Sequence, residues 1–357
     1  MRLSSFKVLN VGDKLFMIAV SIAVAFISWK YIELPFRKRS FIGRRKLWIA
    51  TAVIALLLLC MSLFGYYKEG FPERMGPLAL RTYNEMQTIE FARLTQNGRV
   101  CRSRQPSEAC AFGDQSWVTI GDSTVGVLEP TLQKALEQNN LGLITMNFDQ
   151  CLLGNNMWFG NETRCPQINE ERWKVIEEWS DKKTVVISHR GWFFSDAKEA
   201  GSTQRIAEKS VIEHIDQNIT KLLEKGHRVI LVYPVPDPGF ELKPLLASVV
   251  MRQKEGKLLR KFSSVESAYE DAMSYSRIYD KVPDHPGLIR IYPADLLCPD
   301  KGAGGRRQCL VIGEAGPYYN SGEHLSRLAA GMVNRKIFEA AIAKWNLALE
   351  FGPQTAD

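Results

Sequence analysis

The feature that most restricts this chain is a long apolar run near its start. Leu47–Tyr67 contains no charged residue over 21 positions. As an α-helix with a rise of about 1.5 Å per residue, it spans about 30 Å, the thickness of the hydrocarbon core of a bilayer. A shorter apolar run, Leu15–Trp29, lies between Lys14 and Lys30, whose long side chains can reach the membrane surface. We therefore expect two transmembrane helices, over about 13–33 and 47–67.

Each run also has an alternative interpretation. The longer run can be the buried core helix of a soluble protein, and the shorter one an interfacial helix or a signal sequence. A signal peptide needs small residues at a cleavage site after its apolar stretch. Here Trp29 is followed by Lys30, Tyr31 and Ile32, which are bulky or charged. A membrane anchor is therefore the favoured interpretation.

The basic residues orient this anchor. Residues 37–46 contain six Lys or Arg and lie between the two apolar runs. Loops rich in Lys and Arg remain in the cytoplasm, so this loop is predicted to be cytoplasmic. Everything after Tyr67 then lies on the other side. We therefore expect a membrane protein whose C-terminal domain is extracytoplasmic.

The net charge of +7 is misleading as an indicator of nucleic-acid binding. Residues 1–70 carry eleven Lys or Arg and three Asp or Glu, which leaves 35 basic and 36 acidic residues for 71–357. A protein that binds phosphate backbones needs its basic excess on the folded domain. With a net charge of −1 there, the composition argues against nucleic acid as a partner and favours the lipid bilayer.

The cysteines test this topology independently. Cys60 falls within the longer apolar run, and the other six form neighbouring pairs in the sequence. Disulfides accumulate in oxidising compartments, and neither CxxC nor HxxxH spacing supports the alternative, a zinc site. If neighbours pair, the predicted disulfides are Cys101–Cys110, Cys151–Cys165 and Cys298–Cys309.

The remainder of the chain has the pattern of an α/β domain. Residues 71–114 form a cysteine-containing lead-in, and the domain itself is expected over 115–350. Short apolar, β-branched runs alternate there with helical stretches, which predicts a three-layer α/β/α domain with a mainly parallel sheet. The predicted strands are 117–120, 141–146, 184–188, 228–233 and 288–291. Sites in such folds lie at the carboxyl ends of the strands.

Two widely separated segments carry the chemistry. The first predicted strand runs into Gly121, Asp122 and Ser123, a sharp turn that places a serine at the start of a helix, where backbone N–H groups can stabilise an oxyanion. The alternative is an ordinary strand-to-helix turn with a capping residue. A serine nucleophile needs an imidazole base, which can be distant in sequence. Of five histidines, His324 is best placed, in a glycine-containing loop before the last helix.

Together these segments resemble the SGNH (GDSL-like) hydrolases, in which a first-block Gly-Asp-Ser carries the nucleophile and a last-block His the base. The chain is most similar to the periplasmic SGNH domains fused behind membrane acyltransferases of acyltransferase family three, which O-acetylate bacterial surface polysaccharides such as O-antigens. Tyr31–Arg37 (YIELPFR) resembles the end of the last core transmembrane helix of that family. Arg190 with Trp192, the Leu297–Pro299 segment and His324 also match the order of its blocks.

The resemblance implies roles for individual residues. Ser123 is the expected nucleophile and His324 the expected general base. Oxyanion or substrate contacts are expected from Gly121, Asp122, Cys151, Gly154, His189 and Arg190, with packing at the sheet edge as the alternative for His189 and Arg190. Backbone donors are expected from Ser123 and from the loop at Asp149, Gln150 or Cys151. No metal is implied. Acetyl-CoA is the expected ultimate acyl donor, and a polytopic membrane acyltransferase the expected partner that delivers the acyl group.

The chain departs from the family pattern in three ways. The Asp expected three residues before the His is Ser321, so Asn320, Glu323 or Ser321 itself is the candidate for orienting the imidazole. The third-block Asn is missing, and the second-block Gly has no clear counterpart. Only the last helix of the membrane core has a match, so we expect a fragment that lacks the acyl-translocating helices. The favoured function is an O-acyltransferase; a carbohydrate esterase and a catalytically silent sugar-binding domain are the alternatives.

Overall fold

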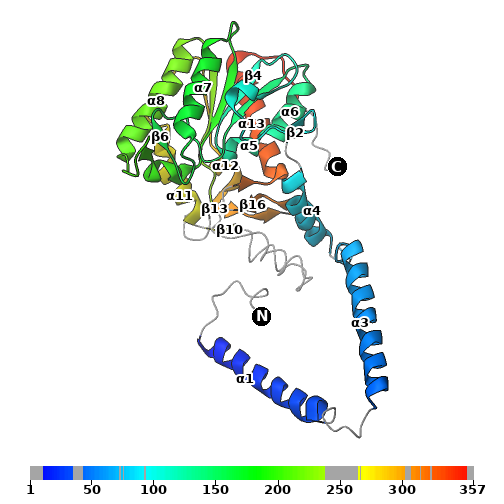
Figure 1. Ribbon diagram of the computed structural model, residues 1–357. Helices are drawn as coiled ribbons and strands as arrows, with labels where there is room; N and C mark the ends of the chain where they lie inside the picture. Colours follow the sequence, from blue (N-terminus) through cyan, green and yellow to red (C-terminus); the bar gives the residue numbers. More distant parts are fainter. Residues whose placement is uncertain are drawn as a thin grey trace. The chain divides into compact units, whose positions relative to one another are not determined.

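The computed structural model describes residues 11–34, 43–71, 74, 76–91, 94–237, 264–265, 267–301, 307–313, 315–321 and 324–351 (Figure 1). The chain divides into two compact units, each described by itself. One comprises Met1–Leu80 with Lys243–Gln253, and the other comprises Arg81–Leu242 with Lys254–Asp357.

The first unit contains two apolar helices. Helix α1 (Val11–Ser28) continues as a π-helical turn, η2 (Trp29–Glu33), and α3 spans Arg44–Tyr67. Among the described residues, Arg45–Tyr67 is the one segment long and apolar enough to cross a membrane; the apolar part of α1, Leu15–Tyr31, is shorter than that length. No residue of Arg45–Tyr67 is buried, which argues against a core helix. The second predicted span remains a prediction, and most of the basic loop 37–46 lies outside the described residues.

The second unit is built on a six-stranded sheet. The strand order is β11-β9-β7-β4-β5-β3, with five parallel strands and β3 antiparallel at the edge beside β5. In this order the strands span Leu288–Ile291, Arg228–Val232, Thr184–Ser188, Trp117–Gly121, Leu143–Asn147 and Cys110–Ala111. The inner strands are continuous apolar runs because both faces of the sheet are covered, which is typical of parallel sheets. The predicted α/β fold with a mainly parallel sheet is confirmed.

Helices cover both faces of this sheet. Helices α6 (Glu129–Glu137) and α13 (Arg327–Trp345) pack together on one face, and α7 (Cys165–Glu177) and α8 (Glu208–Glu224) lie on the other (Figure 1). The chain passes from β4 to β5 in one direction and then returns across β4 to β7. Because crossovers are right-handed, this reversal moves the next helix to the opposite face. The edge at which β4 ends is therefore the switch point where α/β proteins place their sites.

Shorter elements complete the two units. The helical ones are α4 (Pro77–Phe91), η4 (Pro106–Glu108), α5 (Ser123–Gly126), η5 (Gly191–Asp196), α11 (Ser267–Tyr275), η6 (Ser276–Ile278) and α12 (Pro293–Leu297). The small antiparallel pairings join β1 (Thr95–Gln96) with β2 (Arg99–Val100), β6 (Met157–Trp158) with β8 (Lys198–Glu199), β10 (Ser264–Val265) and β12 (Asp300–Lys301) with β13 (Arg307–Leu310), β14 (Ile312–Gly313) with β15 (Gly316–Pro317), and β16 (Tyr319–Ser321) with β17 (His324–Leu325).

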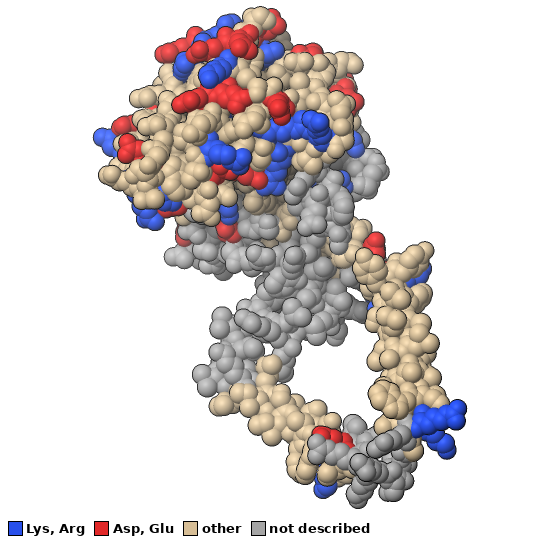
Figure 2. All heavy atoms as spheres, in the orientation of Figure 1, with Lys and Arg blue, Asp and Glu red and all other residues tan. Residues whose placement is uncertain are grey.

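Charges of both signs are interspersed on the face of the second unit that Figure 2 draws, as expected from its net charge. In the same view, charged side chains lie at the N-terminal end of helix α3 and just beyond its C-terminal end, and none lies along its middle. This pattern agrees with the division of the sequence into an apolar, basic-flanked anchor and a domain of nearly balanced charge.

All three predicted disulfides form: Cys101–Cys110, Cys151–Cys165 and Cys298–Cys309. Cys60 is free and exposed. The six paired cysteines are buried, so each bond joins two segments beneath the surface of the second unit. Together with the family described below, the disulfides support an extracytoplasmic location for this unit.

The Cys151–Cys165 bond closes a loop of 14 residues beside the candidate site. We expect the double substitution Cys151→Ala/Cys165→Ala to lower the free energy of unfolding by about 3 kcal/mol, because the unfolded chain gains loop entropy. Thermal unfolding of the full chain in detergent measures this change, with Cys60→Ala as the control. Equal stability of the two variants would contradict the prediction.

Candidate active site

Strand β4 ends in a turn that only glycine can occupy. Gly121 has φ 151°, and a Cβ at this position would lie 2.1 Å from the carbonyl oxygen of Ser188 on the neighbouring strand. The backbone can therefore turn out of the sheet at once, and Ser123 begins the short helix α5 directly beyond it. The serine is placed at the carboxyl edge of the sheet, 8% exposed.

The imidazole of His324 meets this serine. The His324 Nε2 atom lies 2.8 Å from Ser123 Oγ, although 201 positions separate the two residues. His324 begins β17, which pairs with β16 just before α13. Neutral His324 protonated at Nδ1 accepts the Ser123 hydroxyl proton at Nε2, which is the arrangement that activates a serine nucleophile. The predicted meeting of the two segments is thus present in the structure.

Asp122 lies in a different environment from the one predicted. Its side chain is completely buried, and its carboxylate accepts hydrogen bonds from the Thr124 N–H (2.8 Å), the Thr124 hydroxyl (2.7 Å) and the Arg190 N–H (2.8 Å). Burial raises the pKa of Asp122, while these hydrogen bonds and the charge of His324 act in the opposite direction. Asp122 therefore caps α5 and holds the loop after β7.

The loop after β5 offers fewer oxyanion donors than the sequence indicates. The Cys151 N–H donates to Phe148 O (3.0 Å), the Gly154 N–H to Leu152 O (2.9 Å), and the Asp149 N–H to the Ser103 hydroxyl (3.0 Å). These three groups are already occupied, which corrects the expectation for Cys151 and Gly154. The Cys151 side chain is in a disulfide, and Gly154 packs tightly against Met157.

The backbone N–H groups of Ser123, at the first position of α5, and of Gln150 have no acceptor within the described part of the chain. Gln150 has φ 56°, the left-handed conformation that usually favours glycine. Gln150, rather than Gly154, is thus the position where a glycine is to be expected, and its N–H is an available donor of the loop.

His189 lies in the interior instead of facing a substrate. It is completely buried; its Nε2 accepts from the Leu153 N–H (3.1 Å), and its Nδ1 lies 2.8 Å from the Tyr279 hydroxyl. Burial, together with the positive charge of Arg172, lowers the pKa of His189 to about 3. The neutral ring therefore supports the loop that follows β5. Of the two roles left open for His189, a donor at the site and packing, the structure shows packing, because Leu153 contacts one ring nitrogen and Tyr279 the other.

The buried His189 predicts an acid-dependent loss of stability. The unfolded chain binds a proton at this residue below about pH 6.5, while the folded chain does not until about pH 3, so stability is complete above pH 6.5 and falls as the pH is lowered. We expect wild type to lose about 2 kcal/mol more than His189→Gln between pH 6.5 and 5. Denaturant unfolding at both pH values measures this, with His214→Gln as the control. An equal loss in wild type and His189→Gln would refute it.

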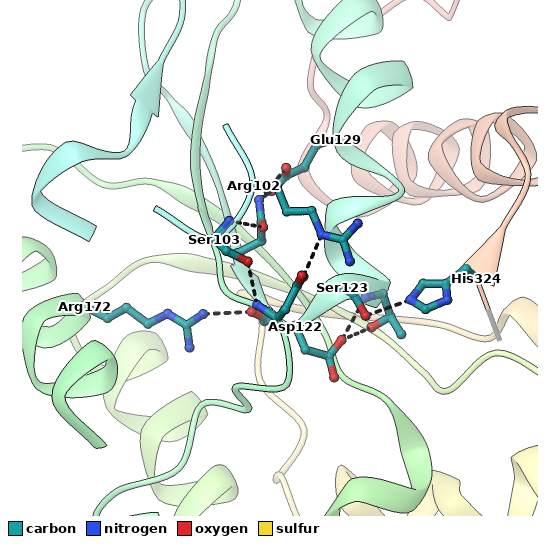
Figure 3. Close-up of polar contacts among 11 residues, drawn as sticks. Arg102, Ser103, Asp122, Ser123, Glu129, Arg172 and His324 are labelled. Atoms are coloured by element: carbon teal, nitrogen blue, oxygen red, sulfur yellow. Dashed lines mark hydrogen bonds and ion pairs between the residues drawn. The ribbon is translucent and has the colours of Figure 1, made fainter. Parts of the chain in front are cut away.

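Arg172 was not among the residues that the sequence indicated. Its guanidinium is completely buried and donates to Gly121 O (2.8 Å), Met146 O (2.8 Å), Cys151 O (3.3 Å) and Asn169 Oδ1 (2.8 Å). Burial lowers the pKa of Arg172 to about 9, so the group remains charged at neutral pH. It ties the ends of β4 and β5 to the loop behind them (Figure 3). The sequence did contain an indication that Arg172 is buried, because it lies four residues from both Ile168 and Ile176, which are on the buried face of α7.

A second buried network lies on the other side of Ser123. The Glu129 carboxylate accepts from the Thr119 hydroxyl (2.6 Å) and from Asn147 Nδ2 (2.6 and 2.8 Å), and Asn147 Oδ1 accepts from the Ser103 N–H (3.2 Å). Burial raises the pKa of Glu129 to about 8, against the effect of these hydrogen bonds. The network joins α6, the end of β5 and the lead-in segment, as Figure 3 shows for the residues that it labels.

The remaining predicted residues have weaker support. Asn320 makes no side-chain hydrogen bond among the described residues, and the side chains of Ser321 and Glu323 lie outside them. The group that orients the His324 ring is therefore still a prediction. Arg190 is half-buried, and its N–H is the group that binds Asp122. The described residues contain no cluster of three or more metal-ligating side chains.

A match to one family model agrees with this geometry. The family model described as "SGNH domain (fused to AT3 domains)" matches residues 95–339. No curated protein matches the chain. Among solved structures, a crystal structure titled as a "putative acylhydrolase" from Bacteroides fragilis NCTC 9343 is 14% identical, covers 74% of this chain and 97% of its own, and has a TM-score of 0.30.

The family match covers more than half of the chain and includes Ser123, His324 and all six paired cysteines. It also includes the complete six-stranded sheet and most of the helices that cover it. The chain therefore belongs to the family of SGNH domains fused to AT3 domains, and it is an acyl-handling enzyme.

Proposed function

We propose that this protein is a serine O-acyltransferase that transfers an acetyl group to a sugar hydroxyl of a cell-surface polysaccharide. The observation that carries the proposal is the 2.8 Å distance between Ser123 Oγ and His324 Nε2 at the carboxyl edge of the sheet. A hydroxyl and an imidazole at this distance can share a proton, and the edge is where α/β folds place their reactions. The family supports acyl chemistry at this pair.

The first half-reaction acylates the serine. Ser123 Oγ attacks the carbonyl carbon of the donor ester while its proton passes to His324 Nε2. The negative charge on the carbonyl oxygen is stabilised by the Ser123 N–H at the start of α5, with the Gln150 N–H as the second candidate donor. When the bond to the leaving group breaks, the leaving oxygen takes the proton from His324. Acetyl-Ser123 remains.

The second half-reaction transfers the acetyl group. A sugar hydroxyl gives its proton to His324 Nε2 as its oxygen attacks the acetyl carbonyl. The bond from the carbonyl carbon to Ser123 Oγ then breaks, and the serine oxygen recovers the proton. If water takes the place of the sugar, the same steps release acetate, which is the carbohydrate esterase reaction.

The supply of acyl groups follows from the proposed location. A domain outside the cytoplasm has no access to acetyl-CoA, so a membrane acyltransferase has to carry the acetyl group across the bilayer. We propose that a polytopic partner does this and that α3, with α1, holds the domain at the inner membrane beside it. The apolar length of α3 and the three disulfides support this arrangement.

The test is detection of the intermediate and of its fate. Full-length protein in detergent is incubated with p-nitrophenyl acetate, quenched in acid and digested. The mass of the peptide that contains Ser123 is then measured by mass spectrometry. We expect an additional acetyl group on Ser123 and, with methyl glucoside present, acetylated glycoside. Acetate as the only product would favour the esterase. Absence of acetylation and turnover would favour the catalytically silent sugar-binding domain.

A further inference from the structure

An ion pair lies beside the Ser123–His324 pair and takes no part in the steps above. Arg102 Nε donates to Asp149 Oδ1 at 2.7 Å, and the two side chains are 36% and 37% exposed. Asp149 is two residues beyond the end of β5, whose last residue, Asn147, pairs in register with Gly121. In Figure 3 the Arg102 guanidinium lies on the same side of the strand ends as Ser123 and His324.

Buried groups hold this exposed pair in place. The Asp149 N–H donates to the Ser103 hydroxyl (3.0 Å), and the Ser103 N–H donates to Asn147 Oδ1 (3.2 Å). Asn147 is in turn bound by Glu129 and lies against α5, 3.6 Å from the position of a Cβ on Gly126. Cys101, the residue directly before Arg102, forms a disulfide with buried Cys110. An ordinary surface ion pair has no such support and contributes little to stability.

The pair leaves several polar atoms available. Arg102 uses only Nε, and Asp149 only Oδ1, so both terminal amino groups and Oδ2 have no partner among the described residues. The pair is neutral as a whole, since one carboxylate balances one guanidinium, and this disfavours an anion as its ligand. Donors and an acceptor side by side match two adjacent hydroxyl groups, because each hydroxyl can both donate and accept.

We propose that Arg102 and Asp149 form the acceptor subsite, where they bind two neighbouring hydroxyl groups of the sugar that attacks acetyl-Ser123. This inference rests on the proposed transferase function and names the part of the site that selects a sugar over water. Arg102 donates hydrogen bonds to both hydroxyl oxygens, and Asp149 Oδ2 accepts a hydrogen bond from one of the two hydroxyl groups. A third hydroxyl of the same ring then points toward the acetyl carbonyl.

The experiment measures how acetyl-Ser123 is partitioned between acceptors. Full-length protein in detergent receives p-nitrophenyl acetate with methyl α-D-glucopyranoside and 1-propanol in competition, and acetylated products are quantified. Methyl glucoside has neighbouring hydroxyl groups and propanol has none. We expect Asp149→Asn and Arg102→Gln each to lower the preference for glucoside over propanol about tenfold, the effect of losing one or two hydrogen bonds. A ratio of products is insensitive to changes in the acylation step.

Asp284→Asn is the matched control, because Asp284 pairs with Arg290 at 2.6 Å but is 95% exposed and precedes β11, at the opposite edge of the sheet. The preference of Asp284→Asn for methyl glucoside over propanol should equal that of wild type. Unchanged preference in both Arg102→Gln and Asp149→Asn overturns the subsite, as does a wild-type preference for methyl glucuronide over methyl glucoside that depends on Arg102. If wild type forms no acetyl-Ser123, the proposed function fails instead. Thermal unfolding identifies a misfolded variant, and the other variant then decides.

Discussion

Replacement of Ser123 by alanine is expected to lower the turnover of an acetyl ester by a factor of about 10⁴ or more. The hydroxyl that His324 Nε2 contacts at 2.8 Å is the nucleophile of the proposed acyl-enzyme. Without it, only general base assistance to water and oxyanion stabilisation remain, and these account for a small part of serine catalysis. Release of p-nitrophenol by the full chain in detergent measures the loss.

Two further variants make this result specific. His324→Ala should lose a similar factor, and the double variant should lose no more than either single one, because the two groups act as a unit. Ser180→Ala is the control, since Ser180 is exposed and follows α7, away from the carboxyl edge of the sheet. Turnover within tenfold of wild type in Ser123→Ala would show that another group is the nucleophile.

Replacement of Arg172 by methionine is expected to reduce the free energy of unfolding by about 3 to 5 kcal/mol. Methionine fills much of the volume but donates no hydrogen bond, so the hydrogen bonds from the guanidinium to the carbonyl groups of Gly121, Met146 and Cys151 are lost. A hydrogen bond that involves a charged group contributes about 1.5 to 3 kcal/mol. Denaturant unfolding of the full chain, monitored by a spectroscopic signal of the second unit, measures the loss.

The same variant tests whether Arg172 positions the nucleophile. Gly121 is two residues before Ser123, so releasing its carbonyl should lower kcat for p-nitrophenyl acetate under conditions where the variant remains folded. Lys174→Met, on the exposed side of the same helix, should change stability by less than about 0.5 kcal/mol. If Arg172→Met loses no more unfolding free energy than Lys174→Met, the proposed role of the guanidinium is excluded.

The buried groups around Ser123 have a common effect. Arg172 on one side and Glu129 on the other bind the strand ends from beneath, while Asp122 caps α5. None of the three side chains is exposed, so they act on substrate only through the backbone they hold. A site of this kind is preorganised, because the serine and its N–H reach their positions when the domain folds.

Local features of the sequence determined a large part of this structure. The continuous apolar runs predicted the five parallel strands, and the neighbouring cysteines predicted the three disulfides that form. The sharp turn at Gly121 was also predicted, because a glycine stands directly between the first strand and the segment that carries Ser123. These features depend on backbone conformation and spacing along the chain, which the sequence expresses directly.

Only the tertiary structure decided what the polar side chains contact. It placed His324 against Ser123 and moved His189 and Asp122 into the interior. It also brought Arg102 of the lead-in segment beside Asp149. The physical reason is that a polar residue in a sequence can equally face solvent, bind substrate or satisfy a buried carbonyl. The choice among these depends on which distant segments cover it once the sheet and its helices have assembled.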